Sequence, residues 1–281
     1  MLKTLGISYS GPDARATCCA ITWVSHMAMV ELPRVGQPEH ELLTEMARTD
    51  WTGITGAPFG WPDAMLDALL TYAETGRWPM QAANDRIRFR ETDRFTRDLL
   101  ADDHGAAVEI VPATHRATAL ATWRCARLLT QHAERTGRDP DRIAVPTSTG
   151  MDGPPDQPRG KVQFPPAGVI ETHVPAALVA WDLSYDPRTF DPGGGDAARA
   201  RRAALLDRIE HELPALLLPG DARSACLTCP DALEALIAAF VACAAATDAT
   251  IKPTVQQRGA AQREGWIHVP VVELGALAPA L

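Results

Sequence analysis

An acidic residue stands inside an otherwise apolar stretch of this chain, where Glu171 interrupts residues 169–174. A carboxylate in a buried strand must be paired, bound to a metal ion or placed at the strand's end, because an isolated buried charge is strongly unfavourable. Two uses therefore stay open for Glu171, a hydrogen-bonding role in the fold and a place in a functional site. His173 lies two residues on, on the same strand face. It is a candidate base or ligand, although a lone histidine on a strand is more often a core residue.

Two further carboxylates lie one helical turn apart. Asp231 follows Pro230 at a predicted helix start, and Glu234 comes three residues later on the same face. One interpretation is local, with Asp231 as an N-terminal cap and Glu234 completing a capping box. The other is that both carboxylates face one site, where their oxygens would suit Mg²⁺. The residues alone leave both interpretations open.

A basic stretch ends at a third acid. Arg86, Arg88 and Arg90 precede Thr92 and Asp93. The simpler interpretation is a solvated loop whose ion pairs contribute little. The functional one is that Arg90 clamps a phosphate or carboxylate, because the guanidinium fork matches those anions, with Thr92 and Asp93 beside it.

The elements expected to position these side chains alternate between strand and helix. Strands are predicted at residues 2–8, 16–24, 27–32, 51–57, 108–111, 169–174 and 266–270. Helices are predicted at residues 39–48, 63–74, 114–135, 175–181 and 231–246, with others near Phe95 and from Asp196 onwards. Residues 140–168 are rich in proline and glycine and are predicted to be a loop-rich insertion. A three-strand meander leading into strand–helix units predicts a mixed sheet with helices on both faces.

Composition limits the class of protein. With 281 residues and 46% hydrophobic side chains, the chain is predicted to fold as a single α/β domain over residues 1–281. Its net charge of −8 argues against long duplex DNA as a partner. The longest apolar run is shorter than the ~20 residues of a membrane span and no signal sequence opens the chain, so a cytoplasmic location without a membrane partner is expected. Cys226 and Cys229 form one C-x-x-C without a second pair, and we predict buried thiols there.

Five segments together carry a family resemblance. They are APFGWP (57–62), RETD (90–93), the E-x-x-x-P-A-A-L pattern of 171–178, DALEAL (231–236) and EGWI (264–267). In this order they resemble the domain-of-unknown-function family numbered 429, described as predicted nucleases with a ribonuclease-H-like fold. The matching pieces span Gly6 to Pro270. The resemblance implies that functional acids gather where the first and fourth predicted strands lie side by side, near Ser8 and Gly56.

The chain departs from that pattern at three places. Sequences of this kind are expected to carry aspartates where this chain has Ser8 and Gly56, and a Tyr-Lys pair where it has Tyr185-Asp186. A serine hydroxyl is a weak, uncharged metal ligand and glycine has no side chain. Loss of two carboxylates should weaken Mg²⁺ binding severely, because hard cations are held by carboxylate charge.

The resemblance therefore implies a member of a predicted nuclease family with an altered acidic site. If it is a catalyst, we expect a hydrolase of a phosphodiester or a small anionic substrate that uses Mg²⁺ or Mn²⁺. The expected roles are catalysis by Glu171, Asp231 and Asp93, metal binding by Glu171, Asp231 and Glu234, and substrate binding by Arg90, Ser8, Thr92 and His173. The alternatives are a non-catalytic nucleotide- or small-molecule-binding protein that uses the same cleft, and a repurposed biosynthetic enzyme. The expected partners are a nucleotide, a short single strand of nucleic acid or a small anionic molecule, and the chain could also form an oligomer.

Overall fold

A mixed seven-stranded sheet forms the centre of the computed structural model, which describes residues 1–9, 15–79, 84–137 and 168–277. The strands are β1 (Leu2–Ser8), β2 (Arg15–Val24), β3 (Met27–Val30), β4 (Arg34–Pro38), β5 (Trp51–Thr55), β6 (Gly168–Glu171) and β7 (Leu216–Leu217). Their order is β6-β5-β1-β2-β3-β7, with β4 paired to β2. Strands β1, β2 and β3 are antiparallel neighbours, whereas β5 and β6 run parallel to β1. The predicted α/β class is confirmed.

Ten α-helices and two short 3₁₀-helices surround the sheet in the described residues. The α-helices are α1 (Glu39–Met46), α2 (Asp63–Thr75), α3 (Asn84–Arg88), α4 (Glu91–His104), α5 (Arg116–Thr136), α6 (Val174–Ala180), α7 (Gly195–Glu212), α8 (Gly220–Thr228), α9 (Pro230–Ala246) and α10 (Arg258–Glu264). The 3₁₀-helices are η1 (Pro187–Phe190) and η2 (Leu274–Leu277). None of the described α-helices is by itself long and apolar enough to cross a membrane; the bent pair α8 and α9 passes that test by length and composition only.

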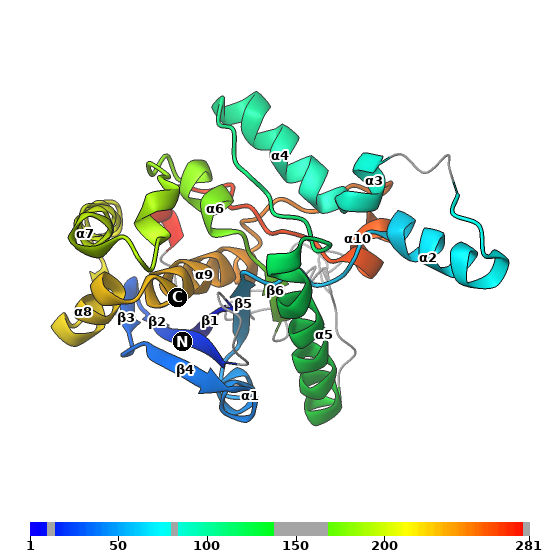
Figure 1. Ribbon diagram of the computed structural model, residues 1–281. Coiled ribbons are helices and arrows are strands. Elements are labelled where there is room, and N and C mark those ends of the chain that lie inside the picture. The colour runs from blue at the N-terminus through cyan, green and yellow to red at the C-terminus, as the bar shows by residue number, and fades with distance from the viewer. Residues whose placement is uncertain (10–14, 80–83, 138–167, 278–281) are drawn as a thin grey trace, which may run out of the picture.

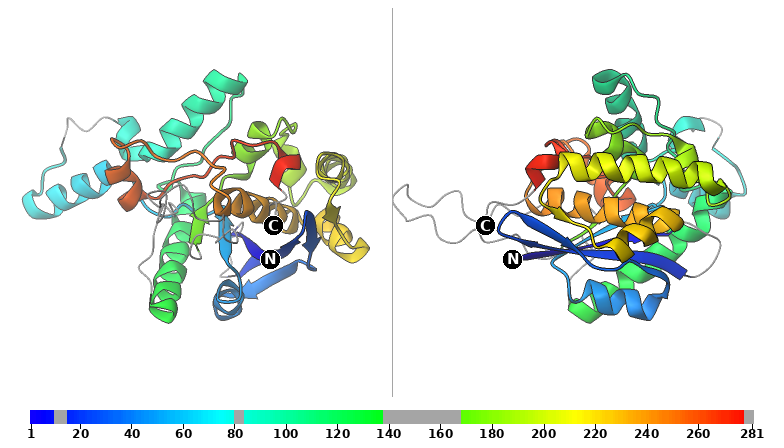
Figure 2. Two further views of the ribbon diagram at one scale, coloured as in Figure 1. Left: turned by 180° about the vertical axis from the view of Figure 1, so that it is seen from behind. Right: turned by 90° about the vertical axis from the view of Figure 1, so that its left-hand side faces the viewer.

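Helices cover both faces of the sheet, as predicted. Helix α9 lies across one face with α7 and α8 beyond it, while α1 and α5 lie on the other (Figures 1 and 2). The two faces have separate cores, because strand side chains alternate between them. Leu5 and Ile7 of β1 pack with α1 and α5, whereas Gly6 of the same strand faces α9.

The contact between α9 and the sheet depends on two glycines. A Cβ added at Gly6 would lie 1.7 Å from the carbonyl oxygen of Ala235, and one at Gly53 would lie 2.3 Å from that of Ala238. Strands β1 and β5 carry these glycines at the same register position. The helix backbone therefore rests directly on the two central strands, and its alanine-rich sequence allows that approach.

Several elements differ from the sequence-based expectation. Residues 108–111 form no strand, because their alternating apolar side chains are buried without a sheet edge to pair with. The segment 266–270 makes isolated bridges in place of a strand. Strands β4 and β7 and helices α8 and α10 were not predicted, since each is short or lacks a strong apolar period. The predicted neighbours 2–8 and 51–57 do lie side by side, as β1 and β5. Most of the predicted insertion at 140–168 lies outside the described residues.

The first prediction concerns this close packing. Gly6→Ala should destabilise the protein by about 3 kcal/mol, because a methyl group there overlaps helix backbone that cannot move aside cheaply. Gly220→Ala is the matched control, since a Cβ at Gly220 meets nothing within 4 Å. Urea unfolding of both variants measures the difference. Equal stability of the two variants would contradict this packing of α9 on β1.

Candidate functional site

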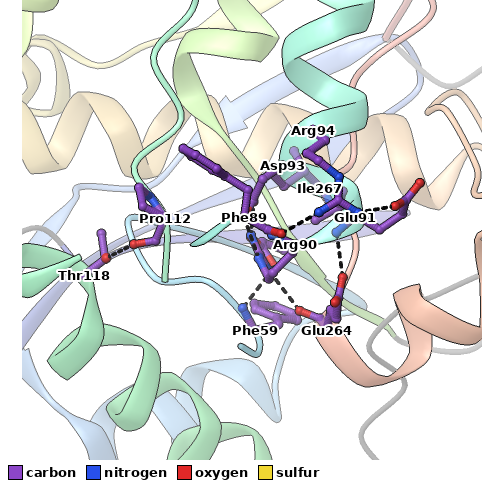
Figure 3. Close-up of polar contacts among 12 residues, drawn as sticks. Phe59, Phe89, Arg90, Glu91, Asp93, Arg94, Pro112, Thr118, Glu264 and Ile267 are labelled. Carbon is purple, nitrogen blue, oxygen red and sulfur yellow. Dashed lines mark hydrogen bonds and ion pairs between the residues drawn. The ribbon is translucent and has the colours of Figure 1, made fainter. Parts of the chain in front are cut away.

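The side chain of Arg90 lies at the centre of a buried polar network. Its guanidinium donates to Glu171 at 2.6 and 2.7 Å, to Asp93 at 2.7 and 3.2 Å, and to the Glu264 carbonyl oxygen at 3.0 Å. These bonds use all five guanidinium donors. Figure 3 shows Arg90 with Asp93, Phe59 and Glu264 around it. Arg90 and Asp93 are each 1% exposed and Glu171 is 3% exposed, so the network is closed to solvent.

Electrostatics hold this network together. Burial opposes the charge of Arg90, but Asp93 and Glu171 outweigh that effect and raise its pKa. Burial raises the pKa of the Glu171 carboxyl, and Arg90 opposes that rise. The backbone N–H of Arg90 also donates to Asp93 at 2.9 Å, which makes Asp93 part of a capping box at the start of α4. Arg90 therefore binds two carboxylates of its own chain, which leaves no donor for an external anion.

The APFGWP and EGWI segments meet at Glu171. The backbone N–H of Phe59 donates to the Glu171 carboxylate at 3.0 Å. Gly265 has a φ of +89°, and a Cβ there would lie 2.7 Å from the Phe59 Cβ and 2.9 Å from a Glu171 oxygen. A Cβ at Gly60 would meet the carbonyl oxygen of Glu264 at 2.9 Å. Both glycines therefore allow the two segments to close around Glu171.

The carboxylate of Glu264 caps two helices at once. It accepts hydrogen bonds from the backbone N–H of Asp63, at the start of α2, at 2.8 Å, and from that of Glu91, at the start of α4, at 2.6 Å. Such bonds satisfy amide donors that a helix leaves free at its amino end. Glu264 thus has a structural role, which is to cap α2 and α4.

Thr92 and His173 also make hydrogen bonds within the fold. The Thr92 hydroxyl accepts from the backbone N–H of Ile267 at 2.8 Å. His173 is the N-cap of α6, and its Nδ1 accepts from the backbone N–H of Ala176 at 3.3 Å. Burial lowers the pKa of His173 to about 4, so the ring is neutral at pH 7 and able to accept.

A second polar group lies at the carboxyl ends of the parallel strands. The Ser8 hydroxyl donates to the Glu234 carboxylate at 2.7 Å. Ser8 pairs in register with Thr55. Thr172 follows β6 directly, and its backbone N–H donates to the carbonyl oxygen of Ile54, the residue before Thr55 in β5. We call Ser8, Thr55, Thr172, Glu234 and Asp231 the polar edge. The three hydroxyl residues are buried, whereas Asp231 and Glu234 are half-buried on the first turns of α9.

The network around Arg90 and the polar edge occupy opposite faces of the sheet. Glu171 pairs in register with Ile54, and Ile54 pairs with Ile7, whose side chain packs in the core beneath α1 and α5. Ser8 points to the other face, where Glu234 projects from α9. The structure therefore brings Glu171, Asp93 and Arg90 together, and separately Ser8 and Glu234. It does not place the Glu171 side chain on the face that carries Asp231.

The carboxylates of the network around Arg90 and of the polar edge do not fit a site for two metal ions. All four carboxylate oxygens of Glu171 and Asp93 accept hydrogen bonds from Arg90. The guanidinium therefore occupies the position between these carboxylates that a metal ion would have to occupy. In the described ranges, no group of three or more His, Cys, Asp or Glu side chains is arranged to hold a metal ion. At the polar edge, Glu234 accepts a hydrogen bond from Ser8, whose hydroxyl carries no charge, where a metal centre would have a second acid.

The backbone conformation at Gly56 also disfavours an acidic residue at this position. Gly56 has a φ of +76°, in the left-handed region that glycine enters without penalty. An aspartate there would carry a conformational cost, although aspartate tolerates this region better than most residues. An aspartate at position 56, as the resemblance implies, would therefore strain the turn as well as add a carboxylate.

The C-x-x-C pair lies in and beside the core. Cys226 is fully buried, and Cys229 is half-buried at the N-cap of α9. Burial raises the pKa of both thiols, that of Cys226 to about 12. Both thiols are therefore neutral at pH 7; Cys226 is buried as predicted, whereas Cys229 is only half-buried.

Comparison with known families identifies the chain. A family model described as "Protein of unknown function (DUF429)" matches residues 13–258. The chain belongs to this family. The match begins after Ser8 and ends before Glu264, so it covers Arg90, Asp93, Glu171 and the start of α9. No curated protein and no solved structure matched the chain.

The sequence analysis did not find the residues that complete the polar edge and the network around Arg90. Thr55 and Thr172 had a usable signal, since each hydroxyl residue lies two residues before the end of a predicted strand, 51–57 and 169–174. The hydrogen bond from Phe59 to Glu171 had none, because a backbone donor leaves no trace in the residue type.

The second prediction tests the buried network. Arg90→Met should cost about 3–5 kcal/mol of folding free energy, because it leaves two carboxylates buried without a counter-charge. The double variant Arg90→Met, Glu171→Gln should recover part of that loss, since one of the two charges is gone. Urea unfolding at pH 7 measures both.

The control for this network is Arg208→Met, which removes an exposed pair with Glu212 on α7 and should cost under about 1 kcal/mol. If Arg90→Met were no more costly than Arg208→Met, the carboxylates would have another partner and this arrangement would be wrong.

The third prediction is a pH dependence from His173. The folded chain lowers the pKa of this ring from 6.5 to about 4, so between these pH values the unfolded chain binds a proton that the folded chain does not. The contribution of the neutral ring to stability is therefore complete above pH 6.5 and declines as the pH falls toward 4, with a loss of about 2 kcal/mol between pH 7 and pH 5. His173→Asn, which can still cap α6 but does not titrate, should show a shallower decline in urea unfolding at pH 7 and pH 5. Parallel declines would exclude His173 as the titrating group.

Proposed function

We propose that this protein binds a small polar molecule at the polar edge, in the cytoplasm, and does not cleave phosphodiesters by a two-metal mechanism. The hydrogen bond from Ser8 to Glu234 carries this proposal. Two acids at these positions would repel each other and would need a cation between them. A hydroxyl donor satisfies Glu234 directly, so the pair is stable without an ion.

The polar groups of the polar edge indicate the chemistry of the ligand. The Thr172 hydroxyl is buried and has no hydrogen-bond partner among the described residues, an arrangement that is costly unless something else completes it. Asp231 and Glu234 bring two carboxylates, which accept from hydroxyl or amino groups. A sugar face with adjacent hydroxyls fits this set of acceptors. We therefore propose a nucleoside or nucleotide bound through its ribose, with any phosphate directed away from the acids.

One observation favours a second candidate. Asp231 and Glu234 are half-buried, lie one turn apart on α9 and flank the carboxyl ends of the parallel strands. A hydrolase that holds a single Mg²⁺ or Mn²⁺ ion through these two acids would use the same edge. It would be the nuclease-like activity that the family resemblance implies, reduced from two ions to one.

The fourth prediction separates the two candidates. Titration calorimetry with the four common ribonucleosides, without divalent ions, should detect saturable binding of at least one of them. Glu234→Gln should weaken that binding about tenfold, because it replaces a charged acceptor by a neutral one. The matched control Glu74→Gln, at an exposed position on α2, should leave the binding unchanged.

The same preparations should be incubated with single-stranded RNA and DNA oligonucleotides and millimolar Mg²⁺ or Mn²⁺. We expect no cleavage. Metal-dependent cleavage that disappears in Glu234→Gln and persists in Glu74→Gln would establish the hydrolase and overturn the binding proposal. Absence of nucleoside binding would also overturn it.

A further inference from the structure

Helix α2 projects from the body of the molecule with little support from the rest of the chain. Its main contacts are with α3 and α10, and it extends away from the sheet (Figures 1 and 2). Within this fully described helix, Ala68 is the one buried residue. A helix of 13 residues is marginally stable in water without tertiary contacts, so α2 would gain stability from a further packing partner.

The most exposed apolar side chains of α2 form one face. Leu66, Leu69, Leu70 and Ala73 stand at i, i+3, i+4 and i+7, the spacing of one side of an amphipathic helix. The three leucines are 41–61% exposed, and Ala73 is also exposed. Buried Ala68 lies roughly on the opposite side of the helix. Helix α2 therefore exposes the face that helices normally bury, and we call these four residues the α2 stripe.

Two aromatic residues widen this surface at the carboxyl end of the helix. The rings of Tyr72 and Trp78 have centroids 6.3 Å apart, and both residues are exposed. Together with the α2 stripe they present roughly 500 Å² of surface, a size that marks an interaction site on a monomer. Two such surfaces amount to about 1,000 Å², the lower range for a specific protein–protein interface.

A second copy of this chain fits the α2 stripe in the antiparallel orientation. With a two-fold axis between Leu69 and Leu70, Leu66 of each copy lies opposite Ala73 of the other. A large side chain then meets a small one at each end of the stripe, and the central leucines of both copies pack at the axis. The stripe is therefore complementary in size to itself.

The charges of α2 favour the same orientation. Asp63 and Asp67 lie in its amino-terminal half, and Arg77 follows its carboxyl end. Asp67 and Arg77 have no ion pair in the described parts of the chain. In an antiparallel pair, Arg77 of each copy lies near the acidic half of the other helix, and the helix dipoles are opposed. A parallel pair would place acids beside acids.

We propose that this protein forms a two-fold symmetric dimer in which α2 packs antiparallel against α2 of a second copy. The α2 stripe lies at the centre of this contact, with Tyr72 and Trp78 at its edges. The proposal is independent of any ligand at the polar edge.

Sedimentation velocity of the full chain over a concentration series tests this dimer. We expect a monomer in dilute samples and a dimer in concentrated ones, with half of the chains paired at on the order of 10 μM, because an interface of this area binds weakly. The dimer should persist at high salt, since its centre is apolar.

A pair of variants identifies the surface. Leu69→Glu with Leu70→Glu should stay monomeric throughout the series, because it gathers four like charges at the two-fold axis. The matched control, Leu32→Glu with Val271→Glu, makes the same charge change at two exposed apolar positions outside α2 and should dimerise as the wild-type chain does. Circular dichroism and urea unfolding of dilute samples show that each variant is folded.

Cross-linking tests the orientation. Chains with Leu66→Cys and chains with Ala73→Cys, carrying different tags and mixed with a short bismaleimide, should form cross-links between the two variants. Each variant alone should give only the background of the wild-type chain, whose own thiols are buried or half-buried.

Three results would overturn the proposal. One is a wild-type chain that stays monomeric throughout the series, which would leave the α2 stripe to a different protein. Another is equal loss of the dimer in the control variant, since net charge would then govern association. The third is cross-linking of each cysteine variant to itself in place of the other, which would indicate a parallel pair.

Discussion

The buried guanidinium of Arg90 is the interaction on which the arrangement of the outer elements depends. It joins the start of α4, the end of β6 and the end of α10, and through Glu171 it reaches the turn at Phe59. No part of this network is stable alone, because each charge is buried and needs the others. Its five donors and the carboxylates they satisfy form a closed set. The buried cluster of Arg90, Asp93, Glu171 and Glu264 therefore has a structural role and positions helices α2, α4 and α10.

The central sheet depends on a different constraint, the direct contact of α9 with β1 and β5. Gly6 and Gly53 leave no space for a side chain, so the helix lies against the strand backbones. This contact sets the first turns of α9 beside the carboxyl ends of the strands. Ser8 and Glu234 can then form a hydrogen bond although 226 positions separate them. The polar edge is thus a consequence of how closely the helix packs.

Much of the secondary structure followed from residue patterns. The strands at the amino end, helix α5 and the apolar helix α9 have long, regular periods or clear caps, and the structure has all of them. Residues 108–111 show the limit of such patterns, since alternating apolar residues can also be buried in a segment without strand partners. Short elements such as β7 and α10 form because neighbouring elements pair with them or cap them. Their own residues give too little local preference to predict them.

By itself, the sequence determined the α/β class, the adjacency of the first strand and the strand at residues 51–55, the family and the residue types from which any site must be built. Those properties depend on local propensity and on motifs that can be read along the chain. Tertiary structure alone decided which acids meet. Glu171 and Asp231 carry the same functional group, and only the strand register and the alternation of side chains place them on opposite faces. The role of Arg90 was decided in the same way, because the carboxylates that occupy its donors come from its own chain, one of them 81 positions away.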